Sequence, residues 1–228
     1  MRPARLRAVP PPPPAALDPA SRGRLAAFYR SALSRYGPGH TMAVWWVNAA
    51  TQRRRFEVLA EVGPWDGASV LDVGCGLGDL FAFLDGRGLS VRYLGCDMLP
   101  EMVAAARKKH PHPRARFEVR DVVERPLPRR FDYVVACGTF NLRVEGHDGY
   151  LRRAIASMYG SCRRAVAFNF LTPVPPDHPD AEIMRKLNGD LFYHLPLPPL
   201  LQWCRGLARR VEVRTGYREF DASLLLFR

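Results

Sequence analysis

The stretch whose residues are best suited to chemistry is VLDVGCGLGDL, residues 70–80. Apolar, strand-forming residues flank Asp72, and then Gly74, Gly76 and Gly78 alternate with other residues before an apolar helix start. Glycines in such a turn let the backbone approach a ligand closely and point the first amides of the helix at it. The stretch therefore predicts a nucleotide-binding turn between a first strand and its helix.

The spacing of the glycines bears on which nucleotide binds. The dinucleotide fingerprint is G-x-G-x-x-G, whose third glycine packs beside a pyrophosphate. Asp79 stands at the place of that third glycine, and Asp72 precedes the turn. Carboxylates here would repel a pyrophosphate and would suit a ligand that carries an ammonium group. A nicotinamide oxidoreductase is therefore the less favoured of two interpretations.

Three later segments continue the pattern. YLGCDMLPEMVAAA (93–106) contains a strand that ends in Asp97 and then a helix start, FEVRDVVE (117–124) is a strand followed by a turn, and FDYVVACGTFN (131–141) is a further strand. Together with the acid and three alternate glycines of the first turn, these segments resemble the class I S-adenosylmethionine-dependent methyltransferases. The resemblance covers roughly residues 55–228 and is closest to a group of small bacterial methyltransferases of unassigned substrate.

The resemblance implies S-adenosylmethionine as the cofactor, S-adenosylhomocysteine as the product, and no metal. Asp97 would bind the ribose hydroxyls and Asp121 the adenine amino group. The backbone amide of Val122 would contact the adenine. The carbonyl of Cys137 or Gly138 would contact the methionine ammonium. The full set of implied cofactor-binding residues is Asp72, Gly74, Cys75, Gly76, Gly78, Asp97, Met98, Asp121, Val122, Cys137 and Gly138. Arg55 is either a contact for the cofactor carboxylate or a solvated member of an arginine run.

Methyl transfer is an in-line displacement on an activated sulfonium, so positioning and exclusion of water supply much of the acceleration. A base is needed only where the acceptor loses a proton early. The side chains that could take that proton are His147, His178, His194, Tyr193 and Asp79, each of which is also explained as an ordinary polar residue. Asn141, just beyond the fourth strand, is the best polar candidate for contact with the acceptor, with His194 and Tyr193 as the other catalytic candidates.

From residue 69 onward, short strand patterns alternate with helical ones. The predicted strands are Ser69–Val73, Val91–Cys96, Arg116–Val119, Phe131–Ala136, Ala165–Phe170, Val211–Thr215 and Ser223–Phe227. The predicted helices are Leu80–Asp85, Pro100–Lys109, Asp148–Tyr159 and Leu200–Leu207. This alternation predicts an α/β fold with a doubly wound, Rossmann-like sheet of seven strands, five of them parallel and the last two an antiparallel hairpin.

The N-terminal region has a different composition. Residues 1–20 contain the polyproline tract Pro10–Pro14, which predicts a disordered leader. Residues 21–228 would form the methyltransferase domain. Its first part, residues 21–62, would be a helical cap, with one helix that starts at Ser21 as N-cap and a second from about Met42 to Val62.

Two segments are candidates to cover the pocket. Trp45 and Trp46 either cover the cofactor or pack as ordinary core residues. Residues 171–199 are long for a connection between a strand and its helix, which favours a lid insertion. The predicted walls of the acceptor pocket are Trp46, Asn141, Phe170, Phe192, Tyr193 and His194, and this aromatic enclosure favours a small or medium organic acceptor.

The chain carries 34 lysines and arginines against 22 acidic residues, a formal net charge of +12. Almost all of the positive charge is arginine, which a GC-rich coding sequence produces without a functional demand. Two alternatives to a small-molecule enzyme stay open: an RNA methyltransferase that uses an arginine-rich surface, and a non-catalytic S-adenosylmethionine-binding protein. The clusters Arg53–Arg55, Arg129–Arg130 and Arg209–Arg210 are far apart in the sequence.

The cysteines and the N-terminal residues bear on the cellular compartment of the protein. The five cysteines form no C-x-x-C pair and mostly lie in apolar runs, so we expect reduced thiols and a cytoplasmic protein. The basic N-terminus runs into prolines instead of an apolar segment, which argues against a secretory signal. No apolar run approaches the roughly 18 residues of a membrane span. The oligomeric state is left open.

Overall fold

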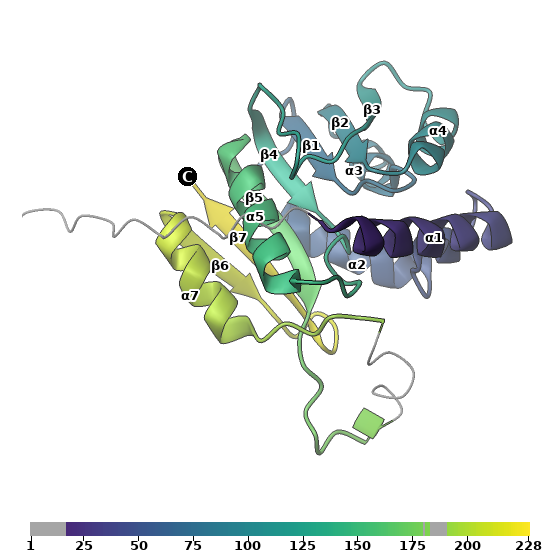
Figure 1. The fold of residues 1–228 in the computed structure, drawn as a ribbon. Coiled ribbons are helices and arrows are strands. Elements are labelled where there is room, and N and C mark those ends of the chain that lie inside the picture. Colours follow the sequence, from purple (N-terminus) through teal and green to yellow (C-terminus); the bar gives the residue numbers. More distant parts are fainter. Residues whose placement is uncertain (1–16, 180, 183–190) are drawn as a thin grey trace, which may run out of the picture.

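The computed structural model describes residues 17–179, 181–182 and 191–228, and its centre is a seven-stranded sheet with the order β3-β2-β1-β4-β5-β7-β6 (Figure 1). The strands are β1 Ser69–Val73, β2 Arg92–Asp97, β3 Ala115–Val119, β4 Phe131–Ala136, β5 Cys162–Leu171, β6 Arg210–Arg214 and β7 Asp221–Phe227. β1 to β5 are parallel, and β7 runs antiparallel between β5 and β6. The predicted fold class is confirmed.

The helices are α1 Pro19–Tyr36, α2 Ala49–Ala60, α3 Asp79–Asp85, α4 Pro100–Lys109, α5 His147–Gly160 and α7 Leu197–Leu207, with a short 3₁₀ helix, η1, at Thr41–Val44. Neighbouring strand residues point to opposite faces of the sheet. Val134 therefore packs with α5 and α7, whereas Val135 packs with α2, α3 and α4. Such alternation buries both faces of the sheet and fixes its register.

The helical cap starts earlier than the sequence pattern predicts. α1 begins at Pro19, with Asp18 as its N-cap accepting a hydrogen bond from the Ser21 amide at 2.9 Å. Ser21 is the fully buried third residue of the helix, not its N-cap. The predicted leader, residues 1–20, therefore overlaps the cap. Residues 1–16 of that leader lie outside the described residues.

The second predicted helix, Met42–Val62, is two elements. η1 ends at Trp45, whose left-handed backbone (φ 58°) interrupts the helical path, and Asn48 then caps α2 by accepting from the Thr51 amide at 2.9 Å. A left-handed residue without glycine is uncommon and leaves no signal in an apolar pattern. This break sends Trp45 and Trp46 in different directions.

The proposed lid, residues 171–199, falls partly on residues 180 and 183–190, which lie outside the described residues. Its last part returns to the sheet, because Phe192 bridges to Leu142 and His194 bridges to Leu171. None of the helices in the described part of the chain is long and apolar enough to cross a membrane.

Candidate functional site

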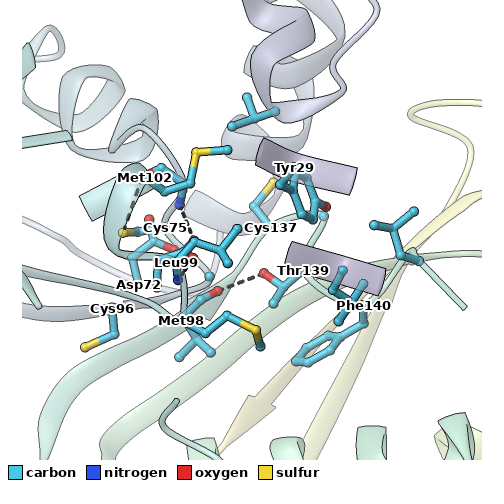
Figure 2. Close-up of a pocket in the computed structure, with 18 of the residues that line it drawn as sticks. Tyr29, Asp72, Cys75, Cys96, Met98, Leu99, Met102, Cys137, Thr139 and Phe140 are labelled. Atoms are coloured by element: carbon cyan, nitrogen blue, oxygen red, sulfur yellow. Dashed lines mark hydrogen bonds between the residues drawn. The ribbon is translucent and has the colours of Figure 1, made fainter. Parts of the chain in front are cut away.

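A pocket lies where the carboxyl ends of β1, β2 and β4 meet, at the point where the strand order reverses (Figure 2). Ligands of open α/β sheets bind at such a switch point. Most of the predicted cofactor-binding residues line this pocket: Asp72, Gly74, Cys75, Gly76, Asp97, Met98, Asp121, Val122, Cys137 and Gly138. Residues from four separate strand ends are thereby brought together.

The glycine turn is held against the end of β2. The amides of Gly74 and Cys75 both donate to the Cys96 carbonyl, at 2.8 and 3.1 Å. Gly74 has a φ of 70°, and a Cβ there would lie 2.5 Å from Cγ2 of Thr139. Only glycine satisfies both the left-handed backbone and the close approach of the β4 end.

Gly78 does not line the pocket. It is the N-cap of α3 with a φ of 77°, and a Cβ there would lie 2.7 Å from the ring of Phe117 and 2.9 Å from that of His110. The third glycine of the motif therefore lets α3 pack against β3 and the end of α4. Its spacing in the sequence does not distinguish this packing role from a ligand contact.

Asp97 joins the end of β2 to the glycine turn. Its two carboxylate oxygens accept one backbone amide each, from Gly76 and from Leu99, both at 3.0 Å. Each oxygen keeps lone-pair capacity for a ligand hydroxyl. Part of the side chain faces the pocket, yet the surrounding protein desolvates it and raises the pKa of the carboxyl, against the lowering effect of those amides.

Asp72 is buried beneath the turn and accepts a hydrogen bond from the Tyr93 hydroxyl. Burial raises the pKa of Asp72 to about 7; the Tyr93 hydrogen bond opposes this, and the nearby charges of Asp97 and Asp79 reinforce it. A cation placed beside Asp72 would stabilise its ionised form. The floor of the pocket is therefore suited to a positively charged group.

Asp121 already has partners on both oxygens. One oxygen accepts the amides of Val123 and Glu124 at 2.9 and 3.3 Å, and the other accepts from the Arg22 guanidinium at 2.8 Å. Arg22 lies on α1 and also pairs with Glu124. This tie between the cap and the end of β3 was not predicted, because it joins residues 99 positions apart.

The cap covers the pocket. Residues from α1, η1, the following turn and α2 line it: Leu25, Tyr29, Val44, Trp46, Gln52 and Phe56. The Trp46 ring packs on the β4 end, since a Cβ on Gly138 would lie 2.7 Å from it. Trp45 instead stacks on Phe28 with ring centroids 4.5 Å apart and is 38% exposed. Of the two tryptophans, Trp46 alone lines the pocket.

Trp46 lines the pocket, as expected of a residue in the predicted acceptor wall. The other five residues of that predicted wall do not line the pocket: Asn141, Phe170, Phe192, Tyr193 and His194. Phe170 is 1% exposed in the core beside α5 and α7. Tyr193 donates its hydroxyl to Asp148 at 2.7 Å, and His194 is half-buried beside Leu171. In the described part of the chain, the Oδ1 of Asn141 is buried without a hydrogen-bond partner. The cap, not the described part of the insertion, supplies the cover.

Two of the five candidate bases reach the pocket, Asp79 and His147. Asp79 is engaged by Lys109 at 2.6 Å and by the Gln52 amide at 3.0 Å. His147 is 5% exposed, its ring stacks on Tyr193 at 3.9 Å, and its Nδ1 finds no partner among the described residues. Burial lowers the pKa of His147 to about 4, which keeps the imidazole neutral near pH 7. His178 pairs with Glu219 instead.

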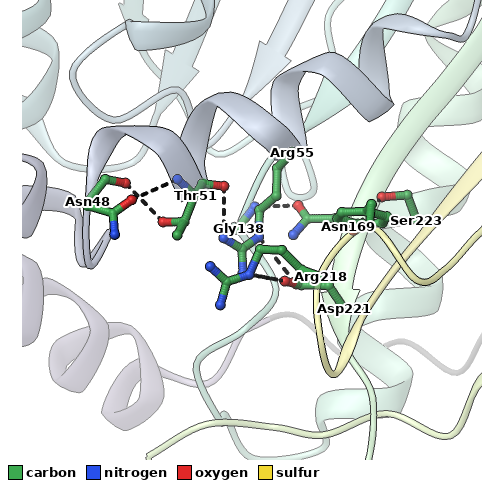
Figure 3. A network of polar contacts seen from close by, with 9 residues as sticks. Asn48, Thr51, Arg55, Gly138, Asn169, Arg218, Asp221 and Ser223 are labelled. Carbon is green, nitrogen blue, oxygen red and sulfur yellow. Dashed lines mark hydrogen bonds and ion pairs between the residues drawn. The ribbon is translucent and has the colours of Figure 1, made fainter.

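Arg55 does not line the pocket; it lies behind the Trp46 ring, 4.6 Å from its centroid, in a buried polar network (Figure 3). Its guanidinium binds both oxygens of Asp221 at the start of β7, and the two side chains are 6% and 1% exposed. Arg218 donates to the same carboxylate at 3.0 Å. Arg55 is thus neither a solvated arginine nor, in this conformation, a cofactor contact; it ties α2 to the C-terminal strand.

Known proteins that resemble this chain are methyltransferases, as expected from the residues of the pocket. A family model described as a methyltransferase domain matches residues 70–164. A protein of Mycobacterium tuberculosis named as a methyltransferase is 32% identical over 174 residues, which is 72% of this chain and 96% of that protein.

Solved structures show the same fold. Magnesium protoporphyrin IX methyltransferase from Synechocystis, solved with S-adenosylhomocysteine, superposes with a TM-score of 0.64 at 15% identity, over 91% of this chain and 99% of that one. The same enzyme solved with S-adenosylmethionine superposes with a TM-score of 0.64 at 17% identity, over 94% and 99%. Together with the family match and the pocket, these findings show that the chain belongs to the class I S-adenosylmethionine-dependent methyltransferases and uses that cofactor for methyl transfer.

Proposed function

We propose that the protein transfers the methyl group of S-adenosylmethionine to a small or medium organic acceptor. The observation that carries this proposal is the cover of the pocket by α1, η1, the turn after η1 and α2, whose Tyr29, Val44 and Trp46 line the pocket together with the glycine turn. A base within a folded nucleic acid or a residue within a protein would have to displace these elements. A free organic molecule fits beneath them more readily.

The residues present fit the cofactor. We place the ribose on Asp97, which keeps lone-pair capacity on both oxygens, and the adenine between Met98, Asp121 and the Val122 amide. The methionine ammonium would lie near Asp72 and the carbonyls of Cys137 or Gly138, because a cation offsets the cost of ionising a buried carboxyl. Gly74 and Gly76 let the backbone pass close to the methionine part.

The cofactor supplies an electrophilic methyl group on a sulfonium, so the chain's own task is to hold the acceptor in line and to exclude water. Where the acceptor is a hydroxyl that must lose its proton, we infer that His147 takes it. Among the candidate bases it combines a place in the pocket wall with an Nδ1 that has no partner among the described residues. Asn141 does not line the pocket, but it follows Phe140 in the pocket wall and its Oδ1 has no partner among the described residues, so it stays a candidate for orienting the acceptor.

The test separates this proposal from both alternatives. Purified protein would be incubated with methyl-labelled S-adenosylmethionine and a cell extract divided into molecules below about 3 kDa, RNA and protein. We expect label in the small-molecule fraction. Label in RNA would favour the RNA methyltransferase, and cofactor binding without labelled product in any fraction would favour a non-catalytic binding protein. A His147→Gln variant that keeps full activity would remove the inferred base.

A further inference from the structure

Arginines from separate parts of the sequence converge at one edge of the sheet, at the amino ends of β4, β5 and β6 and the carboxyl end of β7. Arg129 and Arg130 precede β4, Arg163 and Arg164 are the second and third residues of β5, Arg209 precedes β6, Arg210 begins it, and Arg228 follows β7. We call these seven residues the arginine edge. β7 runs antiparallel to β5 and β6, so its last residues lie beside their first.

The strand register places the arginine edge in one row. Phe227 pairs with Ala165 on one side and with Arg210 on the other, and the Arg228 amide donates to the Arg164 carbonyl at 2.9 Å. On the next strand, the Phe131 amide donates to the Ser161 carbonyl at 2.9 Å. Since neighbouring strands lie about 4.8 Å apart, the row across β4, β5, β7 and β6 is about 14 Å wide.

Several arginines of the edge lie over aromatic rings, which help to hold them in place. Arg129 lies over Phe131 at 5.1 Å, Arg210 over Phe227 at 3.8 Å, and Arg228 over Tyr159 at 4.5 Å. All seven arginines are exposed, whereas Phe131 and Tyr159 are buried beneath them. The guanidinium groups therefore cover the rings, and that of Arg228 also donates to the Tyr159 carbonyl.

Few carboxylates neutralise this charge. Arg164 pairs with Asp132 at 3.5 Å and Arg210 with Glu212 at 2.5 Å. Within the described ranges, no direct ion pair is formed by Arg129, Arg130, Arg163, Arg209 or Arg228, and of these Arg163 acts on the Asp132 carboxylate through its charge. The edge thus presents an unbalanced cluster of planar donors, which bind phosphate in a bidentate manner.

The arginine edge lies at the opposite end of the strands from the pocket. Phe131 begins β4 next to Arg130, and β4 ends at Ala136, directly before Cys137 and Gly138 in the pocket wall. Six extended residues separate the two ends by about 17 Å. The groups that the edge binds therefore lie away from the pocket and leave it free.

We propose that the arginine edge binds the phosphate backbone of nucleic acid, without regard to sequence, as a docking surface separate from methyl transfer. Nucleic-acid interfaces are far more positive than protein interfaces, whose centres are poor in charge and rich in apolar anchors. The large exposed apolar residues of the described chain, Trp45, Val47 and Val119, lie elsewhere, so the edge has no apolar anchor for a membrane. The proposal is independent of the identity of the acceptor.

The test compares two variants of equal charge. The edge variant is Arg130→Gln/Arg163→Gln/Arg209→Gln, whose three side chains lack ion-pair partners among the described salt bridges. The control is Arg35→Gln/Arg53→Gln/Arg54→Gln, three exposed arginines of α1 and α2. Binding to a labelled 20-base-pair RNA duplex and a DNA duplex of unrelated sequence would be followed by fluorescence anisotropy from 50 to 300 mM KCl, with S-adenosylhomocysteine binding as the check on folding.

We expect wild type and control to bind both duplexes alike, and the edge variant to bind at least about tenfold more weakly at 100 mM KCl. The steepness of the plot of log affinity against log salt should fall by about two to three in the edge variant. Each lost phosphate contact lowers the magnitude of this slope by close to one. S-adenosylhomocysteine affinity should not change. Equal weakening of both variants, or tighter binding to phosphatidylserine vesicles or polyglutamate than to the duplexes, would overturn the proposal.

Discussion

At the scale of single residues, the pocket is organised by carboxylates that already have protein partners. Asp97 accepts two backbone amides, Asp72 accepts the Tyr93 hydroxyl, and Asp121 accepts two amides and Arg22. These contacts fix the positions of the acids before a ligand arrives. Preorganised acceptors of this kind lower the cost of ordering on binding.

Replacing Asp97 with alanine removes both its backbone contacts and the proposed acceptor for the ribose hydroxyls. Hydrogen bonds to a charged group are worth about 1.5–3 kcal/mol, so we expect S-adenosylhomocysteine to bind at least about tenfold more weakly to Asp97→Ala. Calorimetric titration measures the affinity, and circular dichroism shows whether the variant is folded. An unchanged affinity in a folded variant would reject the role assigned to Asp97.

The raised pKa of Asp72, about 7, predicts how affinity depends on pH. Below pH 7 the carboxyl is protonated, and binding of an ammonium group must first release that proton. Affinity for S-adenosylhomocysteine should therefore rise by about tenfold from pH 6 to pH 8 and then level off. Asp72→Asn should flatten this profile. An equally steep profile in the variant would assign the proton to another group, for example Asp97.

Sequence patterns located these acids because each ends a strand before a turn. They did not separate Gly78, which packs against Phe117 and His110, from the glycines that line the pocket. They also missed Arg22 and Tyr93, whose contacts with Asp121 and Asp72 join separate elements. Such long-range partners follow from packing, which a local pattern does not record.

At the scale of elements, the cap is attached at both of its helices. α1 is tied to the end of β3 through Arg22, and α2 is tied to β7 through Arg55. Ser21 adds a third contact, because its hydroxyl accepts from the Glu145 amide at 3.0 Å. We infer that release of the cofactor requires at least one of these ties to open.

Arg22→Ala should increase the dissociation rate of S-adenosylhomocysteine by about fivefold or more, because it removes a partly buried tie between α1 and Asp121. Arg30→Ala is the matched control on the same helix. Its pair with Glu101 is exposed on both sides, and such pairs contribute little. Stopped-flow fluorescence of the cap tryptophans would give the rates. Equal rates in the two variants would mean that α1 does not limit release.

The buried Arg55–Asp221 pair predicts a change in stability. Arg55→Met leaves the Asp221 carboxylate buried with only Arg218, which should lower the free energy of unfolding by about 3–5 kcal/mol. The double variant Arg55→Met/Asp221→Leu removes both charges and should regain a large part of that loss. Urea denaturation measures the free energy of unfolding of both variants. A double variant less stable than the single one would contradict the claim that the unpaired, buried charge of Asp221 causes the loss.

The elements of the sheet were predictable, because alternating and helical apolar periods mark them directly. Ser69–Val73, Phe131–Ala136 and Pro100–Lys109 agree with the structure residue for residue. β5 starts three residues before its predicted start, where Arg163 and Arg164 interrupt the apolar run. The cap was predicted as helical, but the break at Trp45 rests on a backbone angle that sequence does not encode strongly.

At the scale of the whole molecule, the two ends of the sheet carry different chemistry. The carboxyl ends of the strands hold an acidic, covered pocket with Asp72, Asp97 and Asp121. The amino ends of β4 and β5, with β6 and the end of β7, carry the arginine edge. Sequence alone could not show that the arginine clusters converge, because the antiparallel register of β7 brings them together.

The central claim is that the covered pocket binds S-adenosylmethionine in place of a dinucleotide. The most direct measurement is calorimetric titration of the purified protein with S-adenosylhomocysteine, with NADH in a parallel titration. We predict one site with micromolar affinity for S-adenosylhomocysteine and no measurable binding of NADH. Absence of S-adenosylhomocysteine binding to the folded protein, or micromolar binding of NADH, would contradict the account.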